Sequence, residues 1–219
     1  MKLFSGPLSM FGAKVEIALR EKHVEFDLEM VPFDRERGYQ PKHPEVLRVN
    51  PKRQVPVLLD GSVEIFDSTQ IFEYLEDRWP DVPLWPRTPA QRAQARGLEH
   101  SSDEVFFPNV IRLMGMRSVP DPVDSPEWIR ARRGIEEYYA LTETVLGDRP
   151  YLAGDYSYAD IAFYMAQFFA ARHTVPMGAL YPRLLAWRRR VAERAAVRPV
   201  IEAMAEYLRS IELPVPEFA

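Results

Sequence analysis

The chain of 219 residues contains no cysteine, and this absence excludes several kinds of chemistry. Without thiols there is no disulfide framework, no thiolate metal site and no protein thiol nucleophile. The histidines are few and far apart (His23, His43, His100 and His173), so we predict no metal site. No apolar run approaches the roughly 20 residues that a membrane span needs. Because "MKLFSGPLSM" also lacks a sustained apolar stretch, we expect a mature cytoplasmic protein without a membrane partner.

The sequence also has no excess of basic residues. Lys and Arg number 28 against 32 Asp and Glu, the formal net charge is −4, and the two signs are interspersed. This balance argues against nucleic acid as a partner. The densest basic run, "WRRRVAERAAVRP", places its charges among apolar residues at helical spacing, which is typical of a solvated helix face. Apolar residues make up 47% of the chain, enough for a globular core.

Residues 1–80 alternate short strand-like and helix-like segments. Strand patterns occur in "KLFS", "VEFDLEMV", "VPVLLD" and "VEIF", and the last two form a hairpin that turns at Asp60-Gly61. Helical patterns fill residues 10–22, "PEVLRV" and "DSTQIFEYLEDRW". The order β-α-β-α-β-β-α predicts a mixed sheet with helices packed on it.

The second part of the chain is predicted to be helical. "WPDVPLWPRTP" contains four prolines in eleven residues and predicts a linker at residues 81–89. No strand pattern follows, so residues 90–219 form an all-α domain. Its first long helix is expected to bend at Pro108, which lacks an amide donor. "SPEWIRARRGIEEYYALTETVLG" is a second helix, and two more are expected within 180–194 and 197–210.

One further helix has a sharply defined start. "SYADIAFYMAQFFAA" is almost entirely apolar and is predicted to be the buried central helix. Ser157 and Asp160 have the spacing of a capping box, which fixes where such a helix begins. We therefore interpret Asp160 as a folding residue and not as a catalytic acid.

Three stretches carry residues that could contact a ligand. Ser9 stands between a turn and a helical pattern, where a hydroxyl either caps the helix or reaches a substrate. A trans Pro56 would begin an edge strand, whereas a cis bond would expose the backbone of Val55 to an extended peptide. Ser68 either caps the helix that follows or, with the helix dipole, binds a carboxylate. The residues alone leave these alternatives open.

Taken together, four motifs make the whole chain resemble the glutathione transferase family: "SMFGAKVEIAL", "NPKRQVPVLLDG", "EIFDSTQIFEYLEDRWP" and "LAGDYSYADIAF". The likeness is closest to serine-type, bacterial-type soluble members with a phi- or tau-like N-terminal motif. It implies a thioredoxin-like α/β domain at 1–80, the linker at 81–89 and an all-α domain at 90–219. The lack of tyrosine before Tyr39 and of any cysteine argues against tyrosine-type and cysteine-type members.

The resemblance also implies roles for individual residues. Ser9 matches the catalytic serine, with Ser5 as a second hydroxyl nearby. The backbone of Val55 would pair with the cysteinyl residue of glutathione. The residues implied in holding the tripeptide are Lys42 at the glycine carboxylate, Gln54, Val55, the cis-proline Pro56, and Asp67 with Ser68 at the γ-glutamyl end. The chain departs from the family where Met10 and Phe11 follow Ser9, and where "NPKRQ" lacks a common glycine.

The implied activity is a glutathione transferase, with no permanently bound cofactor and glutathione as co-substrate. Bound glutathione, as a thiolate, would attack a hydrophobic electrophile or a peroxide, and related chemistry includes thiolysis, dehalogenation and isomerisation. Candidates for the electrophile wall are Met10, Phe11, Phe106, Phe107, Val110 and Met114, with core packing as the alternative for the last four. The resemblance further implies a homodimer. The alternative function is a non-catalytic regulatory subunit of the stringent-starvation type.

Overall fold

The structure is a computed structural model that describes residues 1–34, 36–116 and 122–217. The chain divides into two compact units. The first comprises Met1–Leu84 and Arg194–Pro214, and the second comprises Trp85–Glu193 and the chain from Val215. Within the described residues, no helix is both long and apolar enough to cross a membrane.

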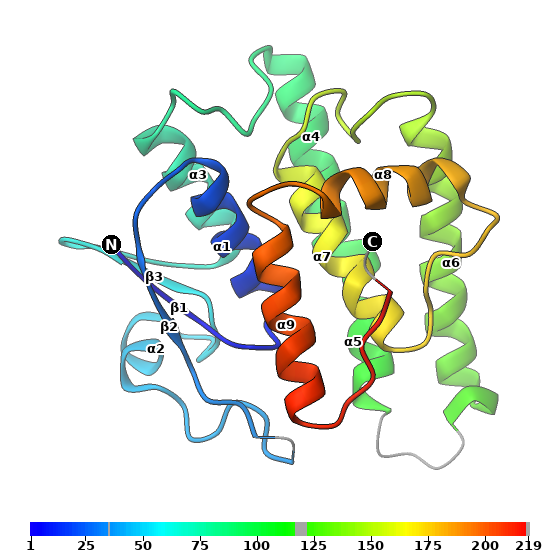
Figure 1. Cartoon of the computed structure of the whole chain (residues 1–219), viewed down its shortest axis with the longest axis horizontal. Coiled ribbons are helices and arrows are strands. Elements are labelled where there is room, and N and C mark those ends of the chain that lie inside the picture. The colour runs from blue at the N-terminus through cyan, green and yellow to red at the C-terminus, as the bar shows by residue number, and fades with distance from the viewer. Residues whose placement is uncertain (35, 117–121, 218–219) are drawn as a thin grey trace. The chain divides into compact units, whose positions relative to one another are not determined.

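The first unit is built on a four-stranded sheet of order β2-β1-β3-β4 (Figure 1). Its strands are β1 (Lys2–Ser5), β2 (Asp27–Met30), β3 (Val57–Asp60) and β4 (Val63–Phe66). β1 runs parallel to β2 and antiparallel to β3, which is antiparallel to β4. The helices between them are α1 (Met10–Glu21), α2 (Pro44–Val49) and α3 (Ser68–Arg78). The predicted order β-α-β-α-β-β-α is confirmed.

Alternation along the strands gives this sheet two apolar faces. Phe4 and Val57 are paired across β1 and β3 and pack with Val46 of α2. The neighbouring pair, Leu3 and Leu58, is fully buried and points to the opposite face, because successive strand residues alternate sides. There α1 and α3 pack against each other and against the strands. The short central strands are therefore covered on both sides, which fixes their register.

Helix α9 (Arg198–Ser210) belongs to the first unit although it lies near the end of the chain. It packs on α1, and just before it Arg194 forms two hydrogen bonds of 2.7 and 2.8 Å to Glu21. The compact units thus differ from the contiguous segments 1–80 and 90–219, because α9 buries its apolar face within the first unit. The boundaries in the sequence stay predictions, and residues 117–121 and 218–219 lie outside the described residues.

The second unit is helical throughout its described elements. They are α4 (Pro89–Ser101), a π-helical turn (Ser102–Phe106), α5 (Phe107–Gly115), a 3-10 turn (Pro122–Asp124), α6 (Pro126–Leu146), α7 (Tyr158–Arg172) and α8 (Pro182–Ala192). Where a bend was expected at Pro108, the structure has the π-helical turn, in which the Phe107 amide donates to the Ser102 carbonyl. The wider turn accommodates a proline that cannot donate.

The predicted central helix is α7, whose residues from Tyr158 to Ala170 are all buried. Its capping box is present, and the Ser157 amide donates to Asp160 Oδ2 at 2.9 Å. Asp160 Oδ1 also accepts from the Leu152 amide at 2.9 Å and from Trp187 Nε1 at 2.8 Å. Burial raises the pKa of Asp160 to about 6, although these hydrogen bonds favour the ionised form. The carboxyl group is thus fully engaged in the fold of its unit.

Candidate functional site

The predicted ligand residues follow strand ends that meet at one edge of the sheet. Val57 at the start of β3 pairs with Phe4 near the end of β1 and with Phe66 at the end of β4. Because both pairs are antiparallel, the segments beyond Phe4, before Val57 and after Phe66 leave the sheet at the same edge. These segments contain Ser9, Val55 with Pro56, and Asp67 with Ser68. The topology of the first unit therefore gathers residues separated by up to sixty positions.

Ser9 is the N-cap of α1, in extended conformation, and is 8% exposed. Its Oγ accepts a hydrogen bond from the Gly12 amide at 3.0 Å, and its own amide donates to the Gly6 carbonyl at 3.0 Å. The cap satisfies one of the free amides at the start of the helix. As the acceptor in this bond, the hydroxyl keeps its own hydrogen for donation to a ligand. Capping and ligand contact are therefore compatible.

A second hydroxyl, that of Ser5, lies beside this cap. Ser5 is 1% exposed, and its Oγ has no hydrogen-bond partner among the described residues. A Cβ placed on Gly12 would lie 2.1 Å from Ser5 Oγ and 3.1 Å from Ser9 Oγ. Both hydroxyls thus lie over the first turn of α1, and the lack of a side chain at Gly12 leaves room for the Ser5 hydroxyl.

The turn between β1 and α1 is held by a tyrosine that the sequence interpretation missed. Tyr39 accepts a hydrogen bond from the Leu8 amide at 3.0 Å. Its ring occupies the space beside Gly6, where a Cβ would meet ring atoms at 2.3 to 2.6 Å. The glycine of "SGPLS" was the available signal, because close approach of another group is one reason for glycine in a turn.

The Val55–Pro56 peptide bond is cis. Val55 is half-buried and lies just before β3, whereas Gln54 is exposed. Asn50 organises the preceding loop, since its Nδ2 donates to the Gln54 carbonyl at 2.6 Å and its Oδ1 accepts from the Lys52 amide at 2.9 Å. The main chain of Val55 is thereby presented at the sheet edge, outside the β1–β3 ladder that starts at Val57.

The start of α3 corrects one detail of the prediction. The N-cap is Asp67, with φ of +74°, and its Oδ1 accepts from the Thr69 amide at 3.2 Å. Ser68, for which a cap was one of the two alternatives, is instead the first helical residue and is buried. An aspartate carboxylate is as good a helix cap as a serine hydroxyl. Because Asp67 caps α3, the Ser68 side chain does not serve as the cap. Lys52 Nζ lies 3.3 Å from Asp67 Oδ2 and links this helix start to the Asn50 loop.

Lys42 precedes α2 and is half-buried. The next residue, His43, is the N-cap of α2, and its Nδ1 accepts from the Glu45 amide at 3.2 Å. His43 Nε2 lies 3.0 Å from Glu29, which also binds Lys2 at 2.8 Å. The hydrogen bond from Lys2 lowers the pKa of Glu29. These contacts fix the start of α2, and thereby the backbone next to Lys42.

The residues predicted for an electrophile wall divide between the units. Met10 is buried in the first turn of α1, and the half-buried ring of Phe11 lies 5.5 Å from Lys14 Nζ. In the second unit, Phe106 is 0% exposed, and its ring centroid lies 5.1 to 5.4 Å from those of three neighbouring aromatic residues, Tyr138, Tyr139 and Phe163. Core packing is thus the better interpretation for Phe106.

The other three predicted wall residues lie in α5. Phe107 makes an edge contact with Phe169 at 6.1 Å, and Val110 is buried. Met114 is half-buried. Their role at a ligand stays a prediction. Within the described residues, no group of three or more His, Asp or Glu side chains could hold a metal ion.

Comparison with known proteins finds two family models that match parts of this chain. Residues 8–78 match the family described as "Glutathione S-transferase, N-terminal domain". Residues 107–195 match "Glutathione S-transferase, C-terminal domain". The first match covers Ser9, the cis loop and the start of α3, and the second covers the capping box of α7.

Individual relatives extend the similarity to most of the chain. Glutathione S-transferase U25 of Arabidopsis thaliana is 32% identical over 86% of this chain and 83% of its own. A glutathione S-transferase of Methylobacterium radiotolerans, solved in complex with glutathione sulfonate, is 30% identical, with a TM-score of 0.77 over 91% of this chain and 93% of its own. The stringent starvation protein A homolog of Coxiella burnetii is 34% identical over 49% of this chain and 48% of its own.

Proposed function

This chain belongs to the glutathione S-transferase family, and we propose that it binds glutathione at the sheet edge and activates its thiol through Ser9. The observation that carries the proposal is the Ser9 cap at this edge, whose Oγ accepts from Gly12 and keeps a hydrogen to donate. On this basis the chain is a glutathione transferase. The serine is a hydrogen-bond donor in this mechanism, and the nucleophile is the bound thiolate.

The physical reason for this arrangement lies in the acidity of a thiol. A free thiol with a pKa near 8.5 is only a few per cent thiolate at neutral pH. A hydroxyl that donates to the sulfur, together with the positive end of the α1 dipole, favours the charged form. A decrease of about two pKa units corresponds to roughly 2.7 kcal/mol of preferential stabilisation of the thiolate. The thiolate then attacks an electrophilic carbon or a peroxide.

The remaining edge residues complement the tripeptide. The backbone of Val55, outside the strand ladder, can pair with the cysteinyl residue as an added strand does. The α-ammonium of the γ-glutamyl end suits the Asp67 carboxylate. Its α-carboxylate suits the Ser68 hydroxyl and the N-terminus of α3. Lys42 can pair with the glycine carboxylate, and Gln54 lies exposed beside the same backbone.

Three finer features are also part of the proposal. The second substrate is a small hydrophobic electrophile that meets the thiolate on the Met10 and Phe11 side of Ser9. The protein forms a homodimer, as its family implies, and works in the cytoplasm. Sedimentation of the purified chain measures the oligomeric state directly, and a panel of electrophiles assayed with glutathione identifies the reaction.

The decisive experiment compares Ser9→Ala with Ser5→Ala. The thiol pKa of bound glutathione is measured from thiolate absorbance against pH, and glutathione affinity is measured by calorimetry. We expect Ser9→Ala to raise the thiol pKa and to lower turnover at neutral pH up to about 100-fold, the equivalent of two pKa units, with similar affinity. If only Ser5→Ala shifts the thiol pKa, Ser5 is the donor and the assignment to Ser9 is wrong.

A second candidate function rests on the similarity to the stringent starvation protein A homolog. In this alternative the fold serves as a non-catalytic regulatory subunit. A calorimetric titration with glutathione separates the two functions. Binding at millimolar or lower concentration supports the enzyme, whereas the lack of binding at millimolar glutathione supports the regulator.

A further inference from the structure

The turn that leads into Ser9 depends on a side chain from another segment. Leu8, the residue before Ser9, is 6% exposed, and a buried amide needs an acceptor. The amide of Ser9 finds one inside the turn, the Gly6 carbonyl at 3.0 Å. The amide of Leu8 donates instead to the hydroxyl oxygen of Tyr39 at 3.0 Å, 31 positions along the chain.

The ring of Tyr39 is packed on several sides. A Cβ on Gly6 would lie 2.3 to 2.6 Å from atoms of the ring and its hydroxyl. Phe33 meets the ring edge to face, with centroids 5.0 Å apart. Tyr39 also packs against the buried cluster that contains Phe4 and Val57. The hydroxyl oxygen that accepts from the turn is therefore placed by packing, as precise positioning of a neighbouring group requires.

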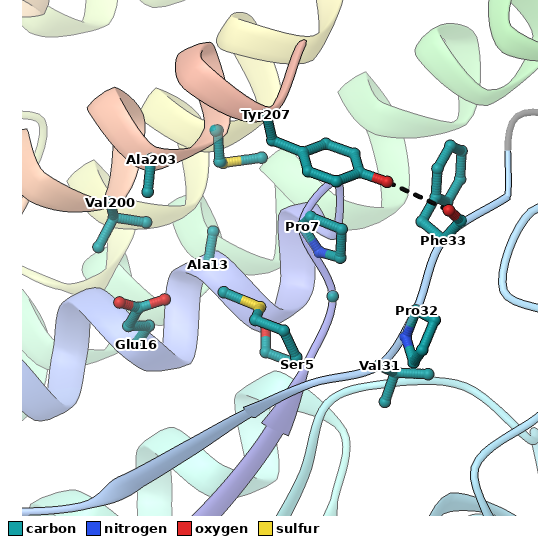
Figure 2. Close-up of a pocket in the computed structure, with 13 residues that line it drawn as sticks. Ser5, Pro7, Ala13, Glu16, Val31, Pro32, Phe33, Val200, Ala203 and Tyr207 are labelled. Atoms are coloured by element: carbon teal, nitrogen blue, oxygen red, sulfur yellow. Dashed lines mark hydrogen bonds between the residues drawn. The ribbon is translucent and has the colours of Figure 1, made fainter. Parts of the chain in front are cut away.

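Phe33 is itself fixed by helix α9. Tyr207 donates to the Phe33 carbonyl at 3.1 Å, and the two rings meet edge to face with centroids 6.4 Å apart. Figure 2 shows this bond between α9 and the chain after β2. Contacts within the first unit thus run without interruption from α9 through Phe33 and Tyr39 to the turn before Ser9.

The hydroxyl of Ser9 is sensitive to the conformation of this turn. Its Oγ accepts from the Gly12 amide at 3.0 Å, which fixes one side of the group. The direction of the remaining hydrogen towards a ligand depends on the backbone of Ser9, and hence on the turn. A hydrogen bond weakens steeply when its angle falls, and small displacements at a reacting group are costly.

We propose that Tyr39 is a positioning residue for Ser9, holding the turn in the conformation in which the Ser9 hydroxyl can donate to the sulfur of bound glutathione. This inference rests on the function proposed for Ser9. Without the tyrosine oxygen, the buried Leu8 amide has to reach water or another acceptor, and the turn moves. A weaker hydrogen bond to the sulfur then raises the pKa of the bound thiol.

The first test is Tyr39→Phe, which removes the oxygen and keeps the ring. The thiol pKa of bound glutathione is measured from thiolate absorbance against pH. We expect it to rise by about one unit, with turnover at neutral pH about tenfold lower and glutathione affinity within about threefold. Tyr74→Phe is the matched control, because it removes a hydroxyl that donates to Asp60 at 2.7 Å in the same unit. It should leave the thiol pKa and turnover unchanged.

A double variant shows whether Tyr39 acts through Ser9. The thiol pKa in Ser9→Ala/Tyr39→Phe should equal that in Ser9→Ala alone, because the hydroxyl that Tyr39 positions is already gone. A further rise in the double variant would mean that Tyr39 acts on the sulfur without Ser9, and the positioning role would be wrong.

A shortened ligand separates Ser9 from Lys42, which follows Tyr39 by three residues. γ-Glutamylcysteine lacks the glycine carboxylate proposed to pair with Lys42. We expect Tyr39→Phe to raise the thiol pKa of bound γ-glutamylcysteine as much as that of bound glutathione. A rise confined to glutathione would assign the effect to the Lys42 segment and overturn the inference.

Gly6→Ala disturbs the same contact from the turn. Its methyl group would lie 2.3 Å from the nearest atom of the Tyr39 ring, so the ring or the turn must move. We expect a higher thiol pKa, as in Tyr39→Phe. In a Tyr39→Ala background, where the ring is absent, Gly6→Ala should cause no further rise. An equal rise in both backgrounds would contradict the role of the ring.

The outcomes distinguish this inference from the proposed function. If Ser9→Ala raises the thiol pKa and Tyr39→Phe does not, the function stands and the positioning role is wrong, even where Tyr39→Phe lowers the free energy of unfolding. If Ser9→Ala leaves the thiol pKa unchanged, or if the wild type does not bind glutathione, the function proposed for Ser9 fails and the role of Tyr39 fails with it.

Discussion

Helices α1 and α7 both begin with a capping serine, but the two caps differ in how many hydrogen bonds their side chains make. At α7, Asp160 accepts from the Ser157 amide, the Leu152 amide and Trp187 Nε1. At α1, Ser9 makes one capping bond and the adjacent Ser5 hydroxyl is buried without a partner among the described residues. We call the start of α7, whose capping groups are all bonded, the closed start. We call the start of α1, where the Ser5 hydroxyl is not bonded within the described part of the chain, the open start.

The difference indicates that the start of α7 stabilises the fold, whereas the start of α1 can bind a ligand. A buried polar network in which every member is bonded rigidifies a core and leaves nothing for a ligand. A partly bonded network costs stability and persists where another molecule completes it. The same residue type at the same helix position therefore serves two purposes, and its neighbours decide which one.

The largest effect on stability is expected from removing the capping carboxylate at the start of α7. Asp160→Ala removes the acceptor of four buried donors, one of them on the fully buried Trp187. We expect a loss of about 4 kcal/mol in the free energy of unfolding. Urea denaturation measures it. Asp155→Ala, an exposed aspartate of the same segment, should change stability by less than about 0.5 kcal/mol. Similar losses in the two variants would contradict the role given to Asp160.

The same carboxyl group predicts a pH dependence. Burial raises the pKa of Asp160 from 3.8 to about 6, so between these pH values the native state binds more protons than the unfolded state. Stability from this group is therefore present below pH 4 and is lost as the pH rises to about 6, by up to roughly 3 kcal/mol. We expect the stability of the wild type relative to Asp160→Asn to fall over this range. A difference that stays constant with pH would contradict the raised pKa.

The closed start was predictable from sequence because its signal is local. Ser157 and Asp160 are three residues apart, and an apolar run follows them. The order of strands and helices was predictable for a similar reason, since alternation and helical spacing are properties of short windows. Asp67 shows the limit of local reasoning. It occupies the capping position that was one of the two alternatives for Ser68, and its positive φ is not encoded in the pattern.

The open start was only half predictable. The resemblance pointed to Ser9, but the surroundings of α1 also include α9, about two hundred residues away in the chain. Its packing against α1 is a tertiary fact that no pattern around residues 5–16 contains. The bonds between Arg194 and Glu21 and between Tyr207 and Phe33 are of the same kind. Contacts between residues so far apart in the sequence cannot be predicted from the spacing or periodicity of residues in short windows.

A smaller effect is expected from closing the space between the two hydroxyls of the open start. Gly12→Ala places a methyl group 2.1 Å from Ser5 Oγ and 3.1 Å from Ser9 Oγ, so a hydroxyl must move. We expect a loss of about 2 kcal/mol, since overpacking exceeds the gain from alanine in a helix. In a Ser5→Ala background the loss should be smaller, because the atom in closest contact is gone. Additive losses in the double variant would show that the loss in Gly12→Ala does not come from contact with the Ser5 hydroxyl.

The smallest effect separates the two serines themselves. Ser9→Ala removes a cap and should cost about 1 kcal/mol in the free energy of unfolding. Ser5→Ala removes a buried hydroxyl without a partner and should be neutral or stabilising by up to about 1 kcal/mol. Thermal or urea unfolding of both variants without ligands measures the difference. If Ser5→Ala destabilised the chain as much as Ser9→Ala, the Ser5 hydroxyl would already be bonded in the free protein, and the open start would be as closed as that of α7. A stability gain would instead mean that Ser5 is retained for a ligand, at the expense of the fold.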